Sequence, residues 1–346
     1  MYLASIDCGT TNTRVYIIDS NANVLGKGTR KVGVRDTSIT GSRDLLKEGL
    51  KEAFYDALES ADLRLEDISF AISAGMITSE VGLMEIPHLW APVGVDDLAE
   101  HLVRVHDLEI FPVNLPIYFI PGIKNTYNLD AVSIEDINAL DFMRGEEAQS
   151  AGIIRNYHND KPLTFVVLSS HTKFIPINEE GKILGSITTL SGQIYDTVKA
   201  NTIISKSLKE GDNQEPENYF DRTIVNSAVA CINKSGFLRT LMMIRFMDVL
   251  LSSKWYERKL FLEAAIAAED MKVLERFESL GFPDNTDMIF IGAESRCQIY
   301  EHILHKTYNW DRAVNFISDV DEIDQLNIQG SLYIAENAGI LITNDE

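Results

Sequence analysis

The sequence predicts an α/β fold built from two domains of similar design, on the strength of two observations. Near the N-terminus, three strand-like segments joined by short polar turns precede alternating helical and apolar segments. A second set of three strand-like segments starts near residue 163 and is again followed by helices and strands. Three strands followed by helix, strand, helix and strand is the order of a ribonuclease-H-like domain, so we expect an internal duplication of this unit.

The first half contains a predicted hairpin followed by helices and strands. Residues 2–7 and 15–20 are apolar runs joined by a short polar turn, and a third strand runs from Val24 towards Val34. Apolar runs joined by a Gly/Asn/Thr turn indicate a hairpin. Residues 43–60 have apolar side chains at helical spacing. The other elements expected in this half are a strand at 68–73, a helix at 95–105, a strand at 116–123 and a helix around 134–156.

The second half repeats the pattern after a polar segment that ends in Pro162, a helix-breaking residue. We therefore expect domains at 1–155 and 156–346, and leave open whether the last helix packs back on the first domain. The elements expected here are strands at 163–170, 173–178 and 182–189, helices through 191–281, a strand at 288–293, a helix at 294–308, a strand at 312–317 and a final helix from about residue 330.

The composition excludes several classes of protein. Hydrophobic residues make up 45% and charged residues 24% of the 346 residues, as in ordinary soluble proteins. No apolar run reaches the roughly 18 residues of a membrane span, and the N-terminus lacks the basic start of a signal peptide. A net charge of -21 disfavours binding to nucleic acid or anionic lipid. Three scattered cysteines without metal-ligand spacing favour a reducing cytoplasm, with no disulfide framework or zinc site.

The loop after the first strand is the strongest candidate site. Asp7 ends the strand, where its carboxylate could hold Mg²⁺. Gly9 allows close backbone approach to an anion. Thr10, Thr11 and Asn12 supply donors for phosphate oxygens, and Arg14 could add a charge-assisted contact. The alternative is a polar hairpin turn whose hydroxyl groups satisfy only the local backbone.

Two segments of the second half could hold a nucleotide. The turn Ser169–Lys173 offers hydroxyl and amide groups from Ser170 and Thr172 and the charge of Lys173. At Gly292–Ala293, a strand runs into a helix whose N-terminus favours anions. The alternatives are a structural turn and a capped strand–helix connection.

Three segments of the first half could contact a substrate. Gly75 and Met76 follow a predicted strand, and Asn125 lies just after another. The segment 143–149 places Arg144, Glu146 and Glu147 in helical context. Taken alone, this last segment also fits a solvated helix face.

Together these segments resemble one family, the 2-keto-3-deoxygalactonate kinases of the actin-like sugar kinase superfamily. The resemblance spans nearly the whole chain. The motifs that carry it are IDCGTTNTR at 6–14, SAGMITSEVG at 73–82, IPGI at 120–123, MRGEEAQ at 143–149, SHTKFI at 170–175, TTLSGQIYD at 188–196 and AENAGI at 335–340.

The resemblance implies an ATP- and Mg²⁺-dependent kinase with a nucleotide cleft between two actin-like domains. It implies phosphorylation of the 6-hydroxyl of 2-dehydro-3-deoxy-D-galactonate, the step before aldol cleavage in galactonate breakdown. Asp7 and the loop 9–12 then form the phosphate and metal loop, and Thr172 and Lys173 belong to the second phosphate loop. We expect Glu146, in preference to Glu147, to act as the base. Arg14 or Arg144 would pair with the sugar carboxylate or a phosphate.

The chain also departs from the family pattern. Cys8 stands where the family usually has Trp, and Ser169–Thr172 stands where Pro-Gly-Thr-His is usual. Two alternatives therefore stay open: a kinase for another sugar, and a non-catalytic ATP- or sugar-binding protein. A homodimer is possible.

Overall fold

The computed structural model describes residues 1–125 and 133–341, which form two compact units. Unit 1 contains the chain up to Lys161, residues 177–186 and the segment from Val320. Unit 2 contains Pro162–Pro176 and Ile187–Asp319. Besides residues 156–161, unit 1 thus includes two further segments from the range 156–346, because Ile183 pairs with Val93 and the last helix packs on α4 (Glu146–Tyr157).

A six-stranded sheet with the order β3-β2-β1-β4-β7-β6 forms the centre of unit 1. Strands β1, β2 and β3 are antiparallel neighbours, and β4 and β7 extend the sheet parallel to β1. The strands are β1 (Tyr2–Cys8), β2 (Thr13–Asp19), β3 (Val24–Arg30), β4 (Ile68–Gly75), β6 (Val103–Val105) and β7 (Ile117–Phe119). A smaller sheet consists of β5 (Leu89–Trp90), β8 (Ile123–Lys124) and β9 (Phe142–Met143).

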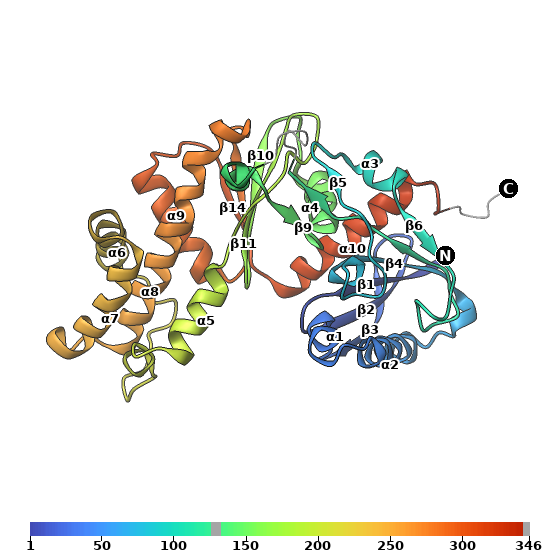
Figure 1. The fold of residues 1–346 in the computed structure, drawn as a ribbon, viewed down its shortest axis with the longest axis horizontal. Coiled ribbons are helices and arrows are strands. Elements are labelled where there is room, and N and C mark those ends of the chain that lie inside the picture. The colour runs from blue at the N-terminus through green and yellow to red at the C-terminus, as the bar shows by residue number, and fades with distance from the viewer. Residues whose placement is uncertain (126–132, 342–346) are drawn as a thin grey trace. The chain divides into compact units, whose positions relative to one another are not determined.

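Helices pack closely on this sheet and on one another. Helix α2 packs on β2 and β3, and α10 lies alongside α4 (Figure 1). A side chain at Gly330 of α10 would come within 1.7 Å of the Ala148 carbonyl oxygen of α4, so this helix crossing requires glycine. The helices of unit 1 are α1 (Val34–Thr40), α2 (Asp44–Ala61), α3 (Val95–Glu100), α4 (Glu146–Tyr157), α10 (Val320–Asn337) and the 3-10 helices η1 (Leu65–Asp67), η2 (Met76–Thr78) and η4 (Ile134–Ala139).

Unit 2 repeats the strand order of unit 1. Its sheet has the order β12-β11-β10-β13-β14, which corresponds to β3-β2-β1-β4-β7, so the predicted duplication of the fold is confirmed. The strands are β10 (Leu163–Leu168), β11 (Thr172–Ile177), β12 (Ile187–Thr189), β13 (Asp287–Ile291) and β14 (Val314–Ile317). The helices are α5 (Ser191–Asn201), α6 (Arg222–Ser235), α7 (Phe237–Leu251), α8 (Trp255–Asp270), α9 (Glu294–Thr307), η5 (Ser205–Leu208), η6 (Met271–Arg276) and η7 (Glu278–Leu280).

Several predicted elements differ from the structure. The strand expected at 116–123 is divided into β7 and β8, which belong to different sheets, and the strand expected at 182–189 is shortened to β12. The helix expected at 95–105 ends at Glu100, because Val103–Val105 pairs with β7 as a strand. The helix expected around 134–156 is divided into η4, β9 and α4, and Gly145, with a φ of +115°, precedes α4. The last helix starts at Val320, ten residues before the predicted position, with Asp321 and Glu322 in its first turn. Within the described residues, no helix is both long and apolar enough to cross a membrane.

Candidate functional site

The first polar loop joins β1 to β2 in unit 1. The Gly9 N–H donates to the Asn12 carbonyl oxygen at 2.9 Å and closes the turn. The carbonyl oxygens of Gly9 and Thr10 accept hydrogen bonds from the first two N–H groups of α1. The side chains of Thr10, Thr11 and Asn12 are exposed. The hydrogen bonds from α1 therefore fix the backbone of the loop, and its side-chain hydroxyl and amide groups face solvent.

Asp7 is paired with Arg14 across this hairpin. The Arg14 Nη1 lies 3.0 Å from the Asp7 Oδ2, and the side chains are 39% and 35% exposed. Partial burial raises the pKa of Asp7, and the charge of Arg14 acts in the opposite direction. No group of three or more His, Cys, Asp or Glu side chains gathers around a possible metal position in the described part of the chain. Asp7 therefore offers a single, partly accessible carboxylate.

Two glycines bring the end of β4 against the start of α4. Gly75 and Gly145 have φ values of +100° and +115°, which favour glycine. A side chain at Gly145 would lie 3.3 Å from the Gly75 Cα, and one at Gly75 would lie 3.0 Å from the Cys8 carbonyl oxygen. The predicted segments around Asp7, Gly75 and Glu146 therefore meet at the carboxyl ends of β1 and β4, two central strands of the unit 1 sheet.

Glu146 and Glu147 begin α4 and differ in exposure. Glu147 is 1% exposed, and its carboxylate accepts the Gly145 N–H. Burial, and then the charge of Glu146, raise the pKa of Glu147 to about 8. Glu146 is only partly buried. Of the two predicted acids, Glu146 is therefore the more exposed.

Arg144 is held by acceptors of unit 1. Its guanidinium donates to the Thr78 Oγ1 at 2.7 Å and to the Ile86 carbonyl oxygen at 2.6 Å. Burial and the Arg144 charge lower the pKa of His88, whose Nδ1 lies 3.3 Å from Arg144, to about 4. Because Thr78 ends η2, Arg144 ties the turn that carries Met76 to the start of α4.

Asn125, a predicted substrate contact, is buried and hydrogen-bonded within unit 1. Asn125 is 5% exposed. Its amide donates to the carbonyl oxygens of Ala139 at 3.2 Å and Ser186 at 2.9 Å, and its oxygen accepts the Ser186 N–H at 2.8 Å. With these bonds made inside the protein, Asn125 holds the segment 177–186 in unit 1.

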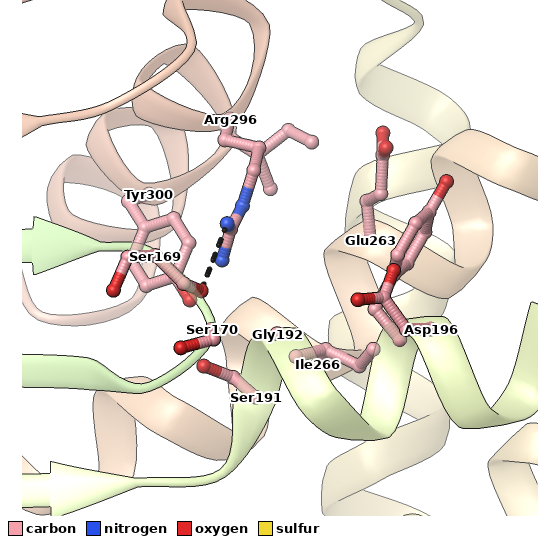
Figure 2. Close-up of a pocket in the computed structure, with 11 residues that line it drawn as sticks. Ser169, Ser170, Ser191, Gly192, Asp196, Glu263, Ile266, Arg296 and Tyr300 are labelled. Atoms are coloured by element: carbon pink, nitrogen blue, oxygen red, sulfur yellow. Dashed lines mark hydrogen bonds between the residues drawn. The ribbon is translucent and has the colours of Figure 1, made fainter. Parts of the chain in front are cut away.

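Unit 2 contains a pocket of about 330 Å³ where the loop after β10 meets α5, α8 and α9 (Figure 2). A side chain at Gly192, in the first turn of α5, would lie 2.2 Å from the Ser169 carbonyl oxygen. This glycine therefore allows the loop and the helix to meet closely. The lining residues are Ser169, Ser170, Ser191, Gly192, Tyr195, Asp196, Glu263, Ile266, Arg296, Ile299 and Tyr300.

The pocket has a basic side and an acidic side. Arg296 donates to the last carbonyl oxygen of β10 at 3.2 Å and points towards Ser169. Figure 2 shows Glu263 and Asp196 on the other side of the pocket. Burial raises the pKa of Glu263, while a nearby lysine and Arg296 oppose this. An anionic group is favoured beside Arg296, and hydroxyl or amino donors are favoured beside the two acids.

Of the residues predicted for the second phosphate loop, Ser170 lines this pocket. Thr172 is fully buried, and its Oγ1 lies 2.5 Å from the Ser191 Oγ. Lys173 is 9% exposed, and its Nζ donates to the Thr188 Oγ1 at 2.9 Å. The side chains of Thr172 and Lys173 thus contribute to the structure behind the loop.

Gly292 and Ala293 lie next to the same loop. Gly292 has a φ of +153°, and a side chain there would come within 2.9 Å of the Leu168 Cβ, while Ala293 occupies the N-cap position of α9. The sequence analysis did not predict the helical residues of the pocket wall. One signal was available, because Glu263 is the only charged residue in the apolar stretch 260–268 of α8.

Comparison with known proteins identifies similar chains. A family model described as 2-keto-3-deoxy-galactonokinase matches residues 7–316. A probable 2-dehydro-3-deoxygalactonokinase from Rhizobium meliloti is 25% identical over 211 residues. That match covers 61% of this chain and 60% of the relative, so the chain spans about three fifths of the length of this curated relative.

Solved structures share the fold. A structure named for a 2-dehydro-3-deoxygalactonokinase protein from Sinorhizobium meliloti has a TM-score of 0.72 at 17% identity and covers 99% of this chain and 100% of its own. The activator of 2-hydroxyisocaproyl-CoA dehydratase from Clostridium difficile, solved with bound ADPNP, has a TM-score of 0.51 at 12% identity over all of both chains. At these identities the similarity concerns the fold, and it confirms the predicted actin-like α/β architecture.

Proposed function

Because the chain belongs to the 2-keto-3-deoxy-galactonokinase family, we propose that it transfers the terminal phosphate of ATP to the 6-hydroxyl of 2-dehydro-3-deoxy-D-galactonate. The observation that carries this proposal is the family match over residues 7–316, which takes in both polar loops and the segment at 143–149. The converging polar segments of unit 1 and the polar pocket of unit 2 support it.

ATP would occupy the pocket of unit 2. The volume of the pocket, about 330 Å³, is large enough to hold part of the nucleotide. The phosphates would lie beside Arg296, Ser170 and the N-terminus of α5, where a positive charge and backbone N–H groups favour anions. The adenine ring of ATP would pack on the apolar and aromatic side chains of Ile266 and Tyr195. Contacts from Thr172, Lys173, Gly292 and Ala293 stay predictions.

The first loop would bind Mg²⁺ and phosphate. Asp7 fits a metal site in its chemistry, because its partly accessible carboxylate offers the oxygen that Mg²⁺ prefers. Bound Mg²⁺ would neutralise charge on the phosphate oxygens. The loop from Gly9 to Asn12 would donate hydrogen bonds to the same oxygens. Arg14, already paired with Asp7, would orient that carboxylate.

The sugar acid would bind at the meeting point of β4 and α4. Gly75 and Gly145 let the end of β4 and the start of α4 approach each other closely, which places Glu146 near the end of β4. Glu146 would accept the proton of the attacking hydroxyl. The buried Glu147 would hold the turn at Gly145, and Arg144 would place positive charge near the sugar carboxylate.

We also propose a homodimer and a cytoplasmic location. Helix α7 exposes large apolar side chains: Leu238 is 80% exposed and Leu250 is 73% exposed. Such patches often mark protein interfaces. Light scattering on the unchanged protein and on Leu238→Glu tests the dimer, which the substitution should dissociate. The three free cysteines are consistent with a reducing compartment.

A coupled ADP-release assay tests the activity. The protein is supplied with Mg-ATP and 2-dehydro-3-deoxy-D-galactonate, its gluconate epimer, or no sugar, and Glu146→Gln serves as the control for contaminating kinases. ADP release that depends on the galacto sugar and disappears in the variant supports the proposal. Turnover with the other sugar alone would favour a different sugar kinase. ATP binding without sugar-dependent turnover would favour a non-catalytic binding protein.

A further inference from the structure

Asp270 is buried behind the pocket of unit 2 and does not line it. It is the last residue of α8 and is 5% exposed. The Tyr300 hydroxyl donates to its Oδ2 at 2.6 Å. The hydroxyl groups of Thr172, Thr189 and Ser191 influence its pKa. They are also linked to one another, because the Thr172 Oγ1 lies 2.5 Å from the Ser191 Oγ and the Thr189 hydroxyl donates to the Ser191 Oγ at 3.4 Å. We refer to these five residues as the Asp270 cluster.

The chemistry of the cluster suits an ionised carboxylate. Burial raises the pKa of Asp270, and the four neighbouring hydroxyl groups act in the opposite direction. An ionised carboxylate only accepts hydrogen bonds. The Tyr300 hydroxyl donates to it, and of the three linked hydroxyl groups one proton is left to donate to it as well. A buried polar network whose members are all satisfied is rigid and specifies one arrangement. The cluster is therefore built to fix the segments that it joins.

Those segments are the ones that form the pocket. Thr172 begins β11 directly after the loop 169–171, Ser191 begins α5, and Tyr300 lies in α9. Ser191 and Tyr300 also line the pocket themselves. The Gln193 N–H of α5 in turn donates to the Ser170 carbonyl oxygen at 2.9 Å. A shift of any cluster member would therefore move a wall of the pocket.

We propose that Asp270 is a positioning residue for nucleotide binding. It holds the loop 169–171, the start of α5 and the Tyr300 ring in the arrangement that binds the phosphates, without touching the nucleotide. The inference rests on the nucleotide site proposed above and adds a residue from outside that site.

The test is Asp270→Asn in the full chain. The amide has nearly the same size but only one oxygen acceptor, and its NH₂ group is a donor, so the Tyr300 hydroxyl or the linked hydroxyl groups of Thr172 and Ser191 lose an acceptor. We expect the dissociation constant of a non-hydrolysable ATP analogue, measured by calorimetry, to rise about ten-fold, which corresponds to about 1.4 kcal/mol. The KM for the sugar should not change. A weaker affinity for the ATP analogue with an unchanged KM for the sugar distinguishes a misplaced pocket from a general loss of folded protein.

Asp248→Asn is the matched control. Asp248 lies in α7, outside the pocket, and accepts hydrogen bonds from the Ser207 hydroxyl at 2.8 Å and from Arg245 at 2.9 Å. The same chemical change there should lower the melting temperature and leave nucleotide affinity unchanged. Wild-type affinity in folded Asp270→Asn protein would overturn the inference, and so would an equal loss of affinity in the control.

Two further outcomes are decisive. If Asp270→Asn does not fold, Tyr300→Phe removes one donor and keeps the ring. Its affinity should fall about three-fold, and an unchanged affinity would overturn the inference. If the unchanged protein does not bind the analogue, the proposed nucleotide site itself is rejected before any variant is compared.

Discussion

Replacing Glu147 by Gln should change how the stability of the protein depends on pH. Glu147 is 1% exposed, and its pKa is raised from 4.5 to about 8, first by burial and then by Glu146. Between these two values the folded protein keeps the proton on Glu147, whereas the unfolded chain releases it. The Glu147→Gln variant keeps an oxygen acceptor for the Gly145 N–H and carries no charge at any pH.

The sign and size of this pH-dependent change in stability follow from proton linkage. Because the folded pKa is raised, the contribution of Glu147 to the free energy of unfolding is greatest below pH 4.5 and falls as the pH rises to about 8. One pH unit corresponds to about 1.4 kcal/mol. The whole interval between the two pKa values corresponds to at most about 5 kcal/mol. The variant does not lose this contribution, so it should gain stability relative to the unchanged protein as the pH rises.

Urea denaturation at pH 5, 7 and 9 measures this difference. The free energy of unfolding of Glu147→Gln, minus that of the unchanged protein, should increase by several kcal/mol from pH 5 to pH 9. Other titrating groups are common to both proteins and cancel. Glu48→Gln, at an exposed position of α2, is the control and should show no such trend. A flat difference for Glu147→Gln would refute the reasoning.

Three other substitutions test the site and the fold. Arg296→Gln should weaken nucleotide binding by about 1.5–3 kcal/mol, the contribution of a charged hydrogen bond, while the KM for the sugar is unchanged; calorimetry measures this. Glu146→Gln should lower kcat by about 10²–10⁴ with both substrates still bound, as loss of a general base does; steady-state kinetics measure this. Gly330→Ala should lower the free energy of unfolding by about 1–3 kcal/mol through overpacking against α4. Urea denaturation measures that loss, and Gly211→Ala is its control, since a side chain at Gly211 would lie at an ordinary 3.7 Å from Trp255.

For each substitution, one result would contradict the prediction. Unchanged nucleotide affinity in Arg296→Gln would show that the phosphates do not bind at the basic side of the pocket. Near wild-type turnover in Glu146→Gln would place the base elsewhere. Equal stability of Gly330→Ala and Gly211→Ala would mean that α4 and α10 can separate without cost.

Local patterns made much of the fold predictable. The hairpins of both units follow from apolar runs joined by short turns, and the corresponding strand orders of the two sheets agree with the predicted duplication. The strand Val103–Val105 was not predictable as a strand, because pairing with β7 decides its conformation. The environment of Asn125 depends on Ser186, 61 residues away.

The candidate site was predictable only in part. Asp7, Gly75 and Glu146 lie on short motifs, and unit 1 brings these motifs together. The pocket of unit 2 is lined from three helices: the start of α5 lies in the motif at 188–196, whereas the lining residues of α8 and α9 lie in no local motif. Asp196, Glu263 and Tyr300 meet only through helix packing, and such packing leaves little signal in a single sequence.

Identification of the product tests the central claim most directly. The protein is incubated with Mg-ATP and 2-dehydro-3-deoxy-D-galactonate, and the sugar product is examined by ³¹P and ¹H NMR. We expect one new phosphate monoester coupled to the protons at carbon 6, formed in equal amount with ADP. A phosphate at another carbon, or ADP without any phosphorylated sugar, would contradict the proposed function.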